Sequence, residues 1–172
     1  MTSQTHPAGD APHAAYDGYD NLLIFRLEGE AFAVSVKGVH EILDPQSPTI
    51  VPNAPRHSPG LINVRGVVVP VFDIRHRLGM GAGTKQATSR MIVFEHEIDG
   101  EAGRLAFSAD SVEEVHEADL AGLEPIPELG AIWPQACLEG AIRRNGELVV
   151  LLNTDVLFSP QGDGDATQTK GA

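Results

Sequence analysis

Short runs of apolar residues, separated by turn residues, fill most of the chain between residues 22 and 158. Runs of this length without a sustained helical periodicity predict β-strands. Strands are expected at Leu22–Leu27, Ala31–Val36, Asn63–Val64, Val67–Ile74, Met91–Phe94, Arg104–Ala109 and Leu148–Leu152. Val39–Leu43 and Val112–Val115 each fit either a further strand or a helical turn. Many short, closely spaced strands predict an all-β fold of small barrels.

Turn residues mark the connections between these runs. Glu28-Gly29, Arg65-Gly66, Asp99-Gly100 and Asn145-Gly146 each separate two apolar runs, and the last pair is the strongest hairpin signal of the chain. Pro70 lies inside the run at 67–74. Because proline has no N–H to donate to a sheet, this strand is expected at a sheet edge or at a bulge.

The two halves of the chain resemble each other. Residues 33–42 align without gaps to 106–115 and share Ala, Ser, Val and Glu at four positions. Residues 60–66 align to 140–146 through the pattern G-x-I-x-x-x-G, and an apolar strand follows both. The same order of elements occurring twice predicts two small barrels packed side by side, at about residues 22–77 and 90–150 with a closing segment to 158. A barrel of roughly 60 residues is marginal alone, so burial between the two is expected to stabilise both.

Charge and hydropathy exclude several functional classes. The net charge of -12 argues against nucleic-acid binding, which normally needs a basic face. The charge is uneven, net +1 over residues 22–77 and net -9 over 78–158, which can steer the approach of a partner. Apolar runs fall well short of the roughly 20 residues of a membrane helix, and residues 1–20 lack the features of a secretory signal. A cytoplasmic protein without membrane insertion is therefore expected.

No catalytic, cofactor or metal site is expected. Cys137 is the only cysteine, so an internal disulfide is impossible and a small buried hydrophobe is its expected role. The seven histidines lack the spacing of metal ligands. The motifs of phosphate-binding loops, zinc proteases and serine hydrolases are missing from the sequence. Residues 1–20 and 159–172 are expected to be disordered tails.

One long stretch resembles a family signature. It consists of Val39-His-Glu-Ile-Leu43, Pro52-Asn-Ala-Pro55 and Gly60-Leu-Ile-Asn-Val-Arg-Gly-Val-Val-Val-Pro-Val-Phe-Asp-Ile-Arg75. These segments are similar to V-x-E-I, P-x-x-P and G-x-x-N-x-R-G-x-x-[IV]-P-[IV]-x-D-[IL]-R of CheW-type chemotaxis coupling proteins. Ala109–Val115 resembles the family's V-D-x-V-x-x-V less closely. The resemblance spans about residues 21–158.

The resemblance implies two SH3-like five-stranded β-barrels with short helical turns, packed around a shared core. It implies a non-catalytic adaptor or scaffold of signal transduction, recruited from the cytoplasm to receptor arrays at the inner membrane. Its partners would be the cytoplasmic tips of chemoreceptors and the regulatory domain of a CheA-type histidine kinase, with weak self-association in the array. The acidic second half departs from the family. It leaves open which receptors and kinase are served, and whether the pathway concerns surface sensing, twitching or gliding motility.

Seven residues are candidates for partner binding. By resemblance, Glu41 and Arg65 form an ion pair beside the receptor groove; the alternative is a surface salt bridge worth under about 1 kcal/mol. Val39, Ile42 and Ile62 would line an apolar groove for a receptor helix, with plain core as the alternative, favoured for Ile62. Gly60 and Gly66 are expected to meet backbone requirements, and Gly60 could also contact a partner directly.

Two rival functions remain at this point. One is an adaptor of another regulatory pathway, which co-purification with a CheA-type kinase would argue against. The other is a small β-barrel enzyme or ligand-binding protein, which a ligand-induced rise in melting temperature would favour.

Overall fold

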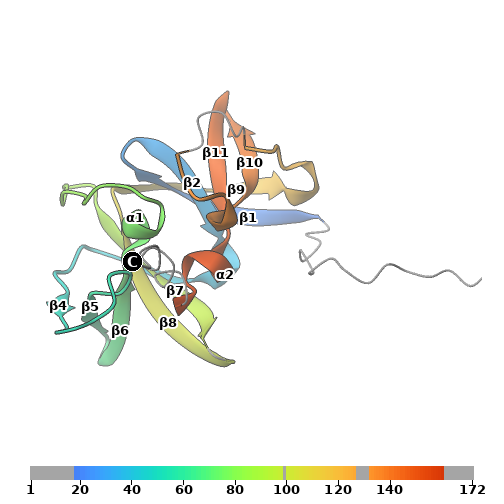
Figure 1. Ribbon diagram of the computed structural model, residues 1–172. Coiled ribbons are helices and arrows are strands. Elements are labelled where there is room, and N and C mark those ends of the chain that lie inside the picture. Colours follow the sequence, from blue (N-terminus) through green and yellow to red (C-terminus); the bar gives the residue numbers. More distant parts are fainter. Residues whose placement is uncertain (1–17, 99, 127–131, 161–172) are drawn as a thin grey trace, which may run out of the picture.

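The computed structural model describes residues 18–98, 100–126 and 132–160. Eleven strands of these residues form two sheets (Figure 1). The helical elements are short: α1 (Ile74–Arg77), α2 (Thr154–Leu157) and the 3-10 turns η1 (Val36–Gly38), η2 (Leu120–Gly122) and η3 (Gln135–Cys137). The predicted all-β class is confirmed.

Sheet A has the strand order β10-β11-β2-β1-β9. Its strands are β1 (Tyr19–Leu27), β2 (Glu30–Ser35), β9 (Ser111–Asp119), β10 (Leu138–Arg144) and β11 (Glu147–Leu152). Neighbours are antiparallel except β2 and β11, which run parallel with Leu151 opposite Ala33. Figure 1 shows blue strands from the start of the chain beside orange and red strands from its end.

Sheet B has the strand order β3-β7-β8-β6-β5-β4. Its strands are β3 (Val39–Leu43), β4 (Thr49–Ile50), β5 (Gly60–Val64), β6 (Val67–Phe72), β7 (Arg90–Ile98) and β8 (Glu101–Ala109). The parallel pair here is β6 with β8, and Val71 lies opposite Ala106. The short β4 adds a sixth strand to the five that were predicted.

The boundary predicted between the barrels is wrong. β1 and β2 pair with β9, β10 and β11, while β7 and β8 pair with β3, β5 and β6, so neither sheet corresponds to residues 22–77 or 90–150. The repeat itself is present, because the two parallel pairings, Leu151 with Ala33 and Val71 with Ala106, join equivalent positions of the aligned halves. A repeat gives the order of elements but not which copy each strand pairs with. The halves exchange their first two strands.

Three apolar clusters follow from this exchange. Sheet A encloses one around Ile24 and Leu151, and sheet B encloses another around Val71 and Val93. The largest cluster lies between the two sheets and takes residues from both. The shared core predicted by resemblance is therefore present, and we call the two curled sheets barrel A and barrel B.

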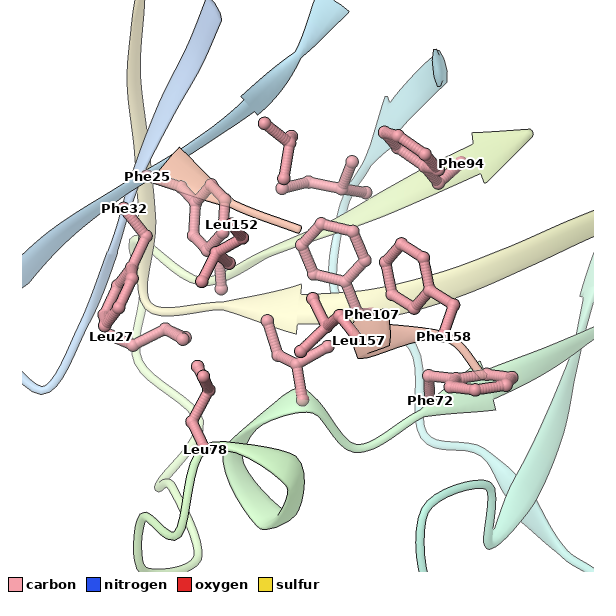
Figure 2. Packing of buried hydrophobic residues seen from close by; sticks show 14 of the residues in the cluster. Phe25, Leu27, Phe32, Phe72, Leu78, Phe94, Phe107, Leu152, Leu157 and Phe158 are labelled. Atoms are coloured by element: carbon pink, nitrogen blue, oxygen red, sulfur yellow. The ribbon is translucent and has the colours of Figure 1, made fainter. Parts of the chain in front are cut away.

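The shared core is rich in aromatic rings. Phe158 follows α2 and packs among Phe72, Phe94 and Phe107, with ring centroids 5.4–5.7 Å away (Figure 2). Burial of each such ring stabilises the fold by about 1.5–3 kcal/mol. The closing segment predicted up to residue 158 thus ends in the core.

Some predicted strand ends differ from the structure. β6 ends at Phe72 because the side chain of Asp73 accepts a hydrogen bond from the N–H of His76 (3.1 Å) and starts α1. Pro70 is not on an edge strand, but β8 pairs only with Val71 and Phe72, so Pro70 needs no N–H toward β8. β1 begins at Tyr19, inside the predicted N-terminal tail. Residues 1–17 and 161–172 of the predicted tails lie outside the described residues.

Candidate partner-binding site

A β-bulge organises β3, which carries three of the predicted site residues. Val39 lies opposite Phe94 of β7, whereas Glu41 lies opposite the preceding residue, Val93. The extra residue is His40. Directly opposed residues of an antiparallel pair share a face, so Val39 faces the shared core with Phe94 while Glu41 turns to the barrel B side with Val93.

The same bulge places Ile42 on the face of Val39. Ile42 lies opposite Ile92, which belongs to the shared core. Without a bulge, residues three apart on a strand would point to opposite faces. A three-residue spacing of apolar positions also fits a helical turn, which is why the sequence left this segment undecided. It is a strand.

Glu41 and Arg65 form the ion pair that the resemblance implied. Arg65 lies in the β5–β6 turn, with its Nη2 3.3 Å from Oε2 of Glu41 and its Nε 3.4 Å from both carboxylate oxygens. The Arg65 side chain is 80% exposed, whereas that of Glu41 is only 18% exposed. The largely buried carboxylate thus holds a guanidinium whose other N–H groups face solvent.

Arg65 has a backbone conformation that arginine rarely adopts. Its φ is +51°, and that of Gly66 is +83°, as a two-residue hairpin turn of type I′ requires. The side chain of Asn63 accepts a hydrogen bond from the N–H of Gly66 (2.8 Å). The equivalent turn of barrel A has Asn145 at the same φ of +51°. Since Asn and Gly tolerate this region better, the turn alone does not explain an arginine at position 65.

The other predicted residues have differing environments. Val39 is partly buried against the shared core, and Ile42 is 42% exposed beside it. Ile62 is only 5% exposed inside barrel B, so it is core and not part of an exposed groove. A Cβ on Gly60 would lie 2.8 Å from Cβ of Pro48, so that space is filled by the chain itself and not open to a partner. Gly66 meets a backbone requirement, as expected.

Sequence reasoning missed Val115. In β9, Glu113 forms a bulge like that of His40, and Val115 lies opposite Leu23 of the shared core. Val115 is 55% exposed and occupies the place of Ile42 in the repeat. The alignment of residues 33–42 with 106–115 already contained this signal, because it matches Ile42 to Val115.

A second missed feature is an apolar strip on the outer face of β5 and β6. Leu61 lies opposite Pro70, and Asn63 lies opposite Val68, so Leu61, Val68 and Pro70 share a face. The interior face is formed by residues such as Ile62 and Val69. Val68 is 62% exposed, although a solvent-facing strand position is usually polar. The run of three valines at 67–69, which breaks polar alternation, is the signal in the sequence.

In barrel A, a cluster of charged side chains connects β1, the bulge of β9 and the residues beside the β10–β11 turn. Arg26 of β1 pairs with Glu113 and Glu147, and Arg144 of β10 pairs with Glu113 and with Glu114 (3.2 Å to the latter). The hydrogen bond from Arg26 lowers the pKa of Glu113, and that of Glu147, below the ordinary glutamate value. Barrel B differs here in composition, since Val67 stands where barrel A has Glu147.

The site offers little for catalysis. Among the residues that the structure describes, no three His, Cys, Asp or Glu side chains are grouped so that they could hold a metal ion. Cys137 is buried as predicted, and burial raises the pKa of its thiol, which disfavours the nucleophilic thiolate. A hollow of about 390 Å³ near Arg75 and Lys85 lies away from Glu41 and Arg65. Of the helices described, none has the length and apolarity to cross a bilayer.

Comparisons with known proteins give a consistent result. The model of the CheW-like domain matches residues 21–161. The chemotaxis protein CheW of Bacillus subtilis is 28% identical over 147 residues, covering 86% of this chain and 92% of that protein. The chemotaxis protein CheW of Rhizobium meliloti is 26% identical over 142 residues, covering 83% and 89%. The crystal structure of the scaffolding protein CheW from Thermoanaerobacter tengcongensis has a TM-score of 0.71 at 28% identity, covering 93% of this chain and 96% of that one. The chain therefore belongs to the CheW family.

Proposed function

We propose that the chain is a non-catalytic adaptor that couples chemoreceptors to a CheA-type histidine kinase. Membership of the CheW family supports this function, and a solved relative is named a scaffolding protein. The protein would work in the cytoplasm, assembled with receptor tips at the inner membrane and associating weakly with its own kind. No cofactor takes part.

One observation carries the receptor side of the proposal. Arg65 occupies a turn position that favours Asn or Gly, yet its guanidinium is held by Glu41 and is 80% exposed. Strained backbone positions cluster at functional sites, so an exposed arginine kept at one is a candidate for partner contact. The fork of N–H groups could bind a carboxylate or carbonyl oxygens of a receptor helix, while the neighbouring Ile42 gives it an apolar contact.

The kinase side is assigned to the outer strip of Leu61, Val68 and Pro70. An apolar strip on the solvent face of a sheet suits a protein partner. The strip lies on barrel B, whose strands fall within residues 39–109. This range has seven acidic and seven basic residues, so its formal net charge is zero and it adds little repulsion. We assign it to the regulatory domain of the kinase, which the family resemblance describes as having the same fold.

A pull-down from the lysate of the protein's own host tests the proposal. The full chain serves as bait, with Arg65→Asn and Val68→Glu as matched variants. We expect the full chain to recover a CheA-type kinase and chemoreceptors, Arg65→Asn to lose the receptors, and Val68→Glu to lose the kinase. Recovery of neither partner at tens of micromolar, about the range of weak interfaces, would contradict the proposal. The identity of the receptors would separate flagellar chemotaxis from surface sensing, twitching or gliding.

A further inference from the structure

His40, the bulged residue of β3, contacts two carboxylates. Its Nδ1 lies 3.2 Å from Oε1 of Glu95 on β7, and its Nε2 lies 4.0 Å from Oε1 of Glu41. The His40 side chain is 32% exposed, so these contacts are partly shielded from water. Glu95 is in turn 3.6 Å from Nε of Arg104 on β8. A line of alternating groups therefore runs from Arg65 through Glu41, His40 and Glu95 to Arg104.

In barrel A, the bulged residue of β9 is likewise linked to the neighbouring strand, β1. Glu113 is the bulged residue there, and its partner is Arg26 of β1. Arg26 of β1 and Glu95 of β7 occupy equivalent positions. Each directly follows the phenylalanine that lies opposite the residue before the bulge. The two barrels thus make an equivalent link with different side chains, a glutamate to an arginine in one and a histidine to a glutamate in the other.

A bulge leaves one residue unpaired and disrupts the ladder locally, so the backbone there lacks part of the restraint of regular strand pairing. In barrel B the residue after the bulge is Glu41, whose carboxylate holds Arg65. A link from His40 to β7 therefore restrains the backbone next to Glu41. The recurrence of the link in both barrels, with unrelated side chains, favours a mechanical role over a chance surface contact.

We propose that His40 and Glu95 are positioning residues that hold Glu41, and through it the Arg65 guanidinium, in the orientation that the partner binds. The inference rests on the proposed receptor-binding function and extends its site from β3 and the β5–β6 turn to β7. Neither residue needs to touch the receptor. Both would raise the fraction of molecules in which the Arg65 guanidinium has the orientation that the receptor binds.

Binding assays with variants of His40 test the role. His40→Leu keeps bulk but removes both nitrogens, His40→Asn keeps an N–H donor near the place of Nδ1, and His40→Gln places it near Nε2. We expect His40→Leu to weaken binding of a purified receptor cytoplasmic fragment by about two- to fivefold, the range of partly exposed ion pairs. His40→Asn should restore most of the loss, and His40→Gln should not. Glu95→Ala should match His40→Leu, while Glu97→Ala, an exposed glutamate of the same strand, should bind as the unmodified chain does.

A second readout needs no receptor. The side-chain Nε–H signal of Arg65 in an NMR spectrum of the free protein reports its contact with Glu41. We expect His40→Leu and Glu95→Ala to shift this signal toward its position in Glu41→Gln, with His40→Asn close to the unmodified chain. If the signal shifts but the unmodified chain binds no receptor fragment, the proposed function fails and the positioning role stands. An unmoved signal together with unchanged affinity would overturn the positioning role.

Discussion

The guanidinium of Arg75 and the carboxylate of Asp110 form an ion pair where the chain passes from sheet B to sheet A. Both side chains are largely buried, at 12% and 14% exposed. The other carboxylate oxygen of Asp110 accepts the N–H of Glu28 (2.8 Å), and the backbone N–H of Asp110 donates to the carbonyl of Arg26 (2.9 Å). Asp110 thus joins the β1–β2 turn of one barrel to α1, which follows β6 of the other.

Asp110→Asn should therefore destabilise the protein strongly. The asparagine can still accept the N–H of Glu28, but it leaves the mostly buried guanidinium of Arg75 without its full counter-charge. We expect a loss of about 2–3 kcal/mol in the free energy of unfolding, measured by urea denaturation. Arg143→Ala is the control, because its pair with Glu124 is exposed and should contribute under about 1 kcal/mol. A loss in Asp110→Asn no larger than the control would remove the pair as a link between the barrels.

At Arg65, stability and binding should respond independently to substitution. Arg65→Asn loses the ion pair with Glu41 but places a residue that tolerates a φ of +51° in the turn. Arg65→Ala loses the pair and keeps the strain. We expect the asparagine variant to be more stable than the alanine variant by about 0.5–1 kcal/mol, while both bind receptor fragments equally poorly. Thermal unfolding and titration calorimetry measure the two quantities, and equal stability of the two variants would contradict this account of the turn.

Gly60→Ala should disturb the β4–β5 contact without blocking a binding surface. The new Cβ would lie 2.8 Å from Cβ of Pro48 and 2.9 Å from the carbonyl oxygen of Thr49. Overpacking of this kind costs about 1–3 kcal/mol. Gly81→Ala is a matched control, because its nearest neighbour, Oε1 of Glu28, would be 3.9 Å away. Amide hydrogen exchange should show faster opening near Thr49 in Gly60→Ala only; a stable variant with lost binding would instead make Gly60 a direct contact.

The sequence predicted most elements because each apolar run and each turn carries its own local signal. Asn145-Gly146 and Arg65-Gly66 form hairpins as expected, and Asp73 and Asn153 start equivalent short helices at equivalent places in the repeat. The exchange of strands could not be predicted. β2 offers the same apolar edge to β11 that β8 offers to β6, so pairing within a copy and between copies satisfies the local pattern equally.

The residues of the candidate site were likewise predicted only in part. The ion pair of Glu41 with Arg65 was expected from the family resemblance, and the structure contains it. Val115, His40 and Glu95 were not expected, because their places depend on two bulges. A bulge changes which residues share a face but leaves only a three-residue spacing in the sequence, which a helical turn would also produce.

The charge cluster that closes barrel A should make stability depend on pH. Hydrogen bonds from Arg26, and then from Arg144, lower the pKa of Glu113 in the folded state below its ordinary 4.5. The unfolded chain therefore takes up the proton first as the pH falls. The stabilisation is complete above pH of about 5 and is lost as the pH drops through the lowered folded-state value. We expect Glu113→Gln to cost about 1 kcal/mol at pH 7 and nearly nothing at a pH of about 2, measured by urea unfolding at both. In an Arg26→Ala background the cost at pH 7 should shrink, because the main donor is gone; an equal cost at both pH values would show that Glu113 acts through packing and not through its charge.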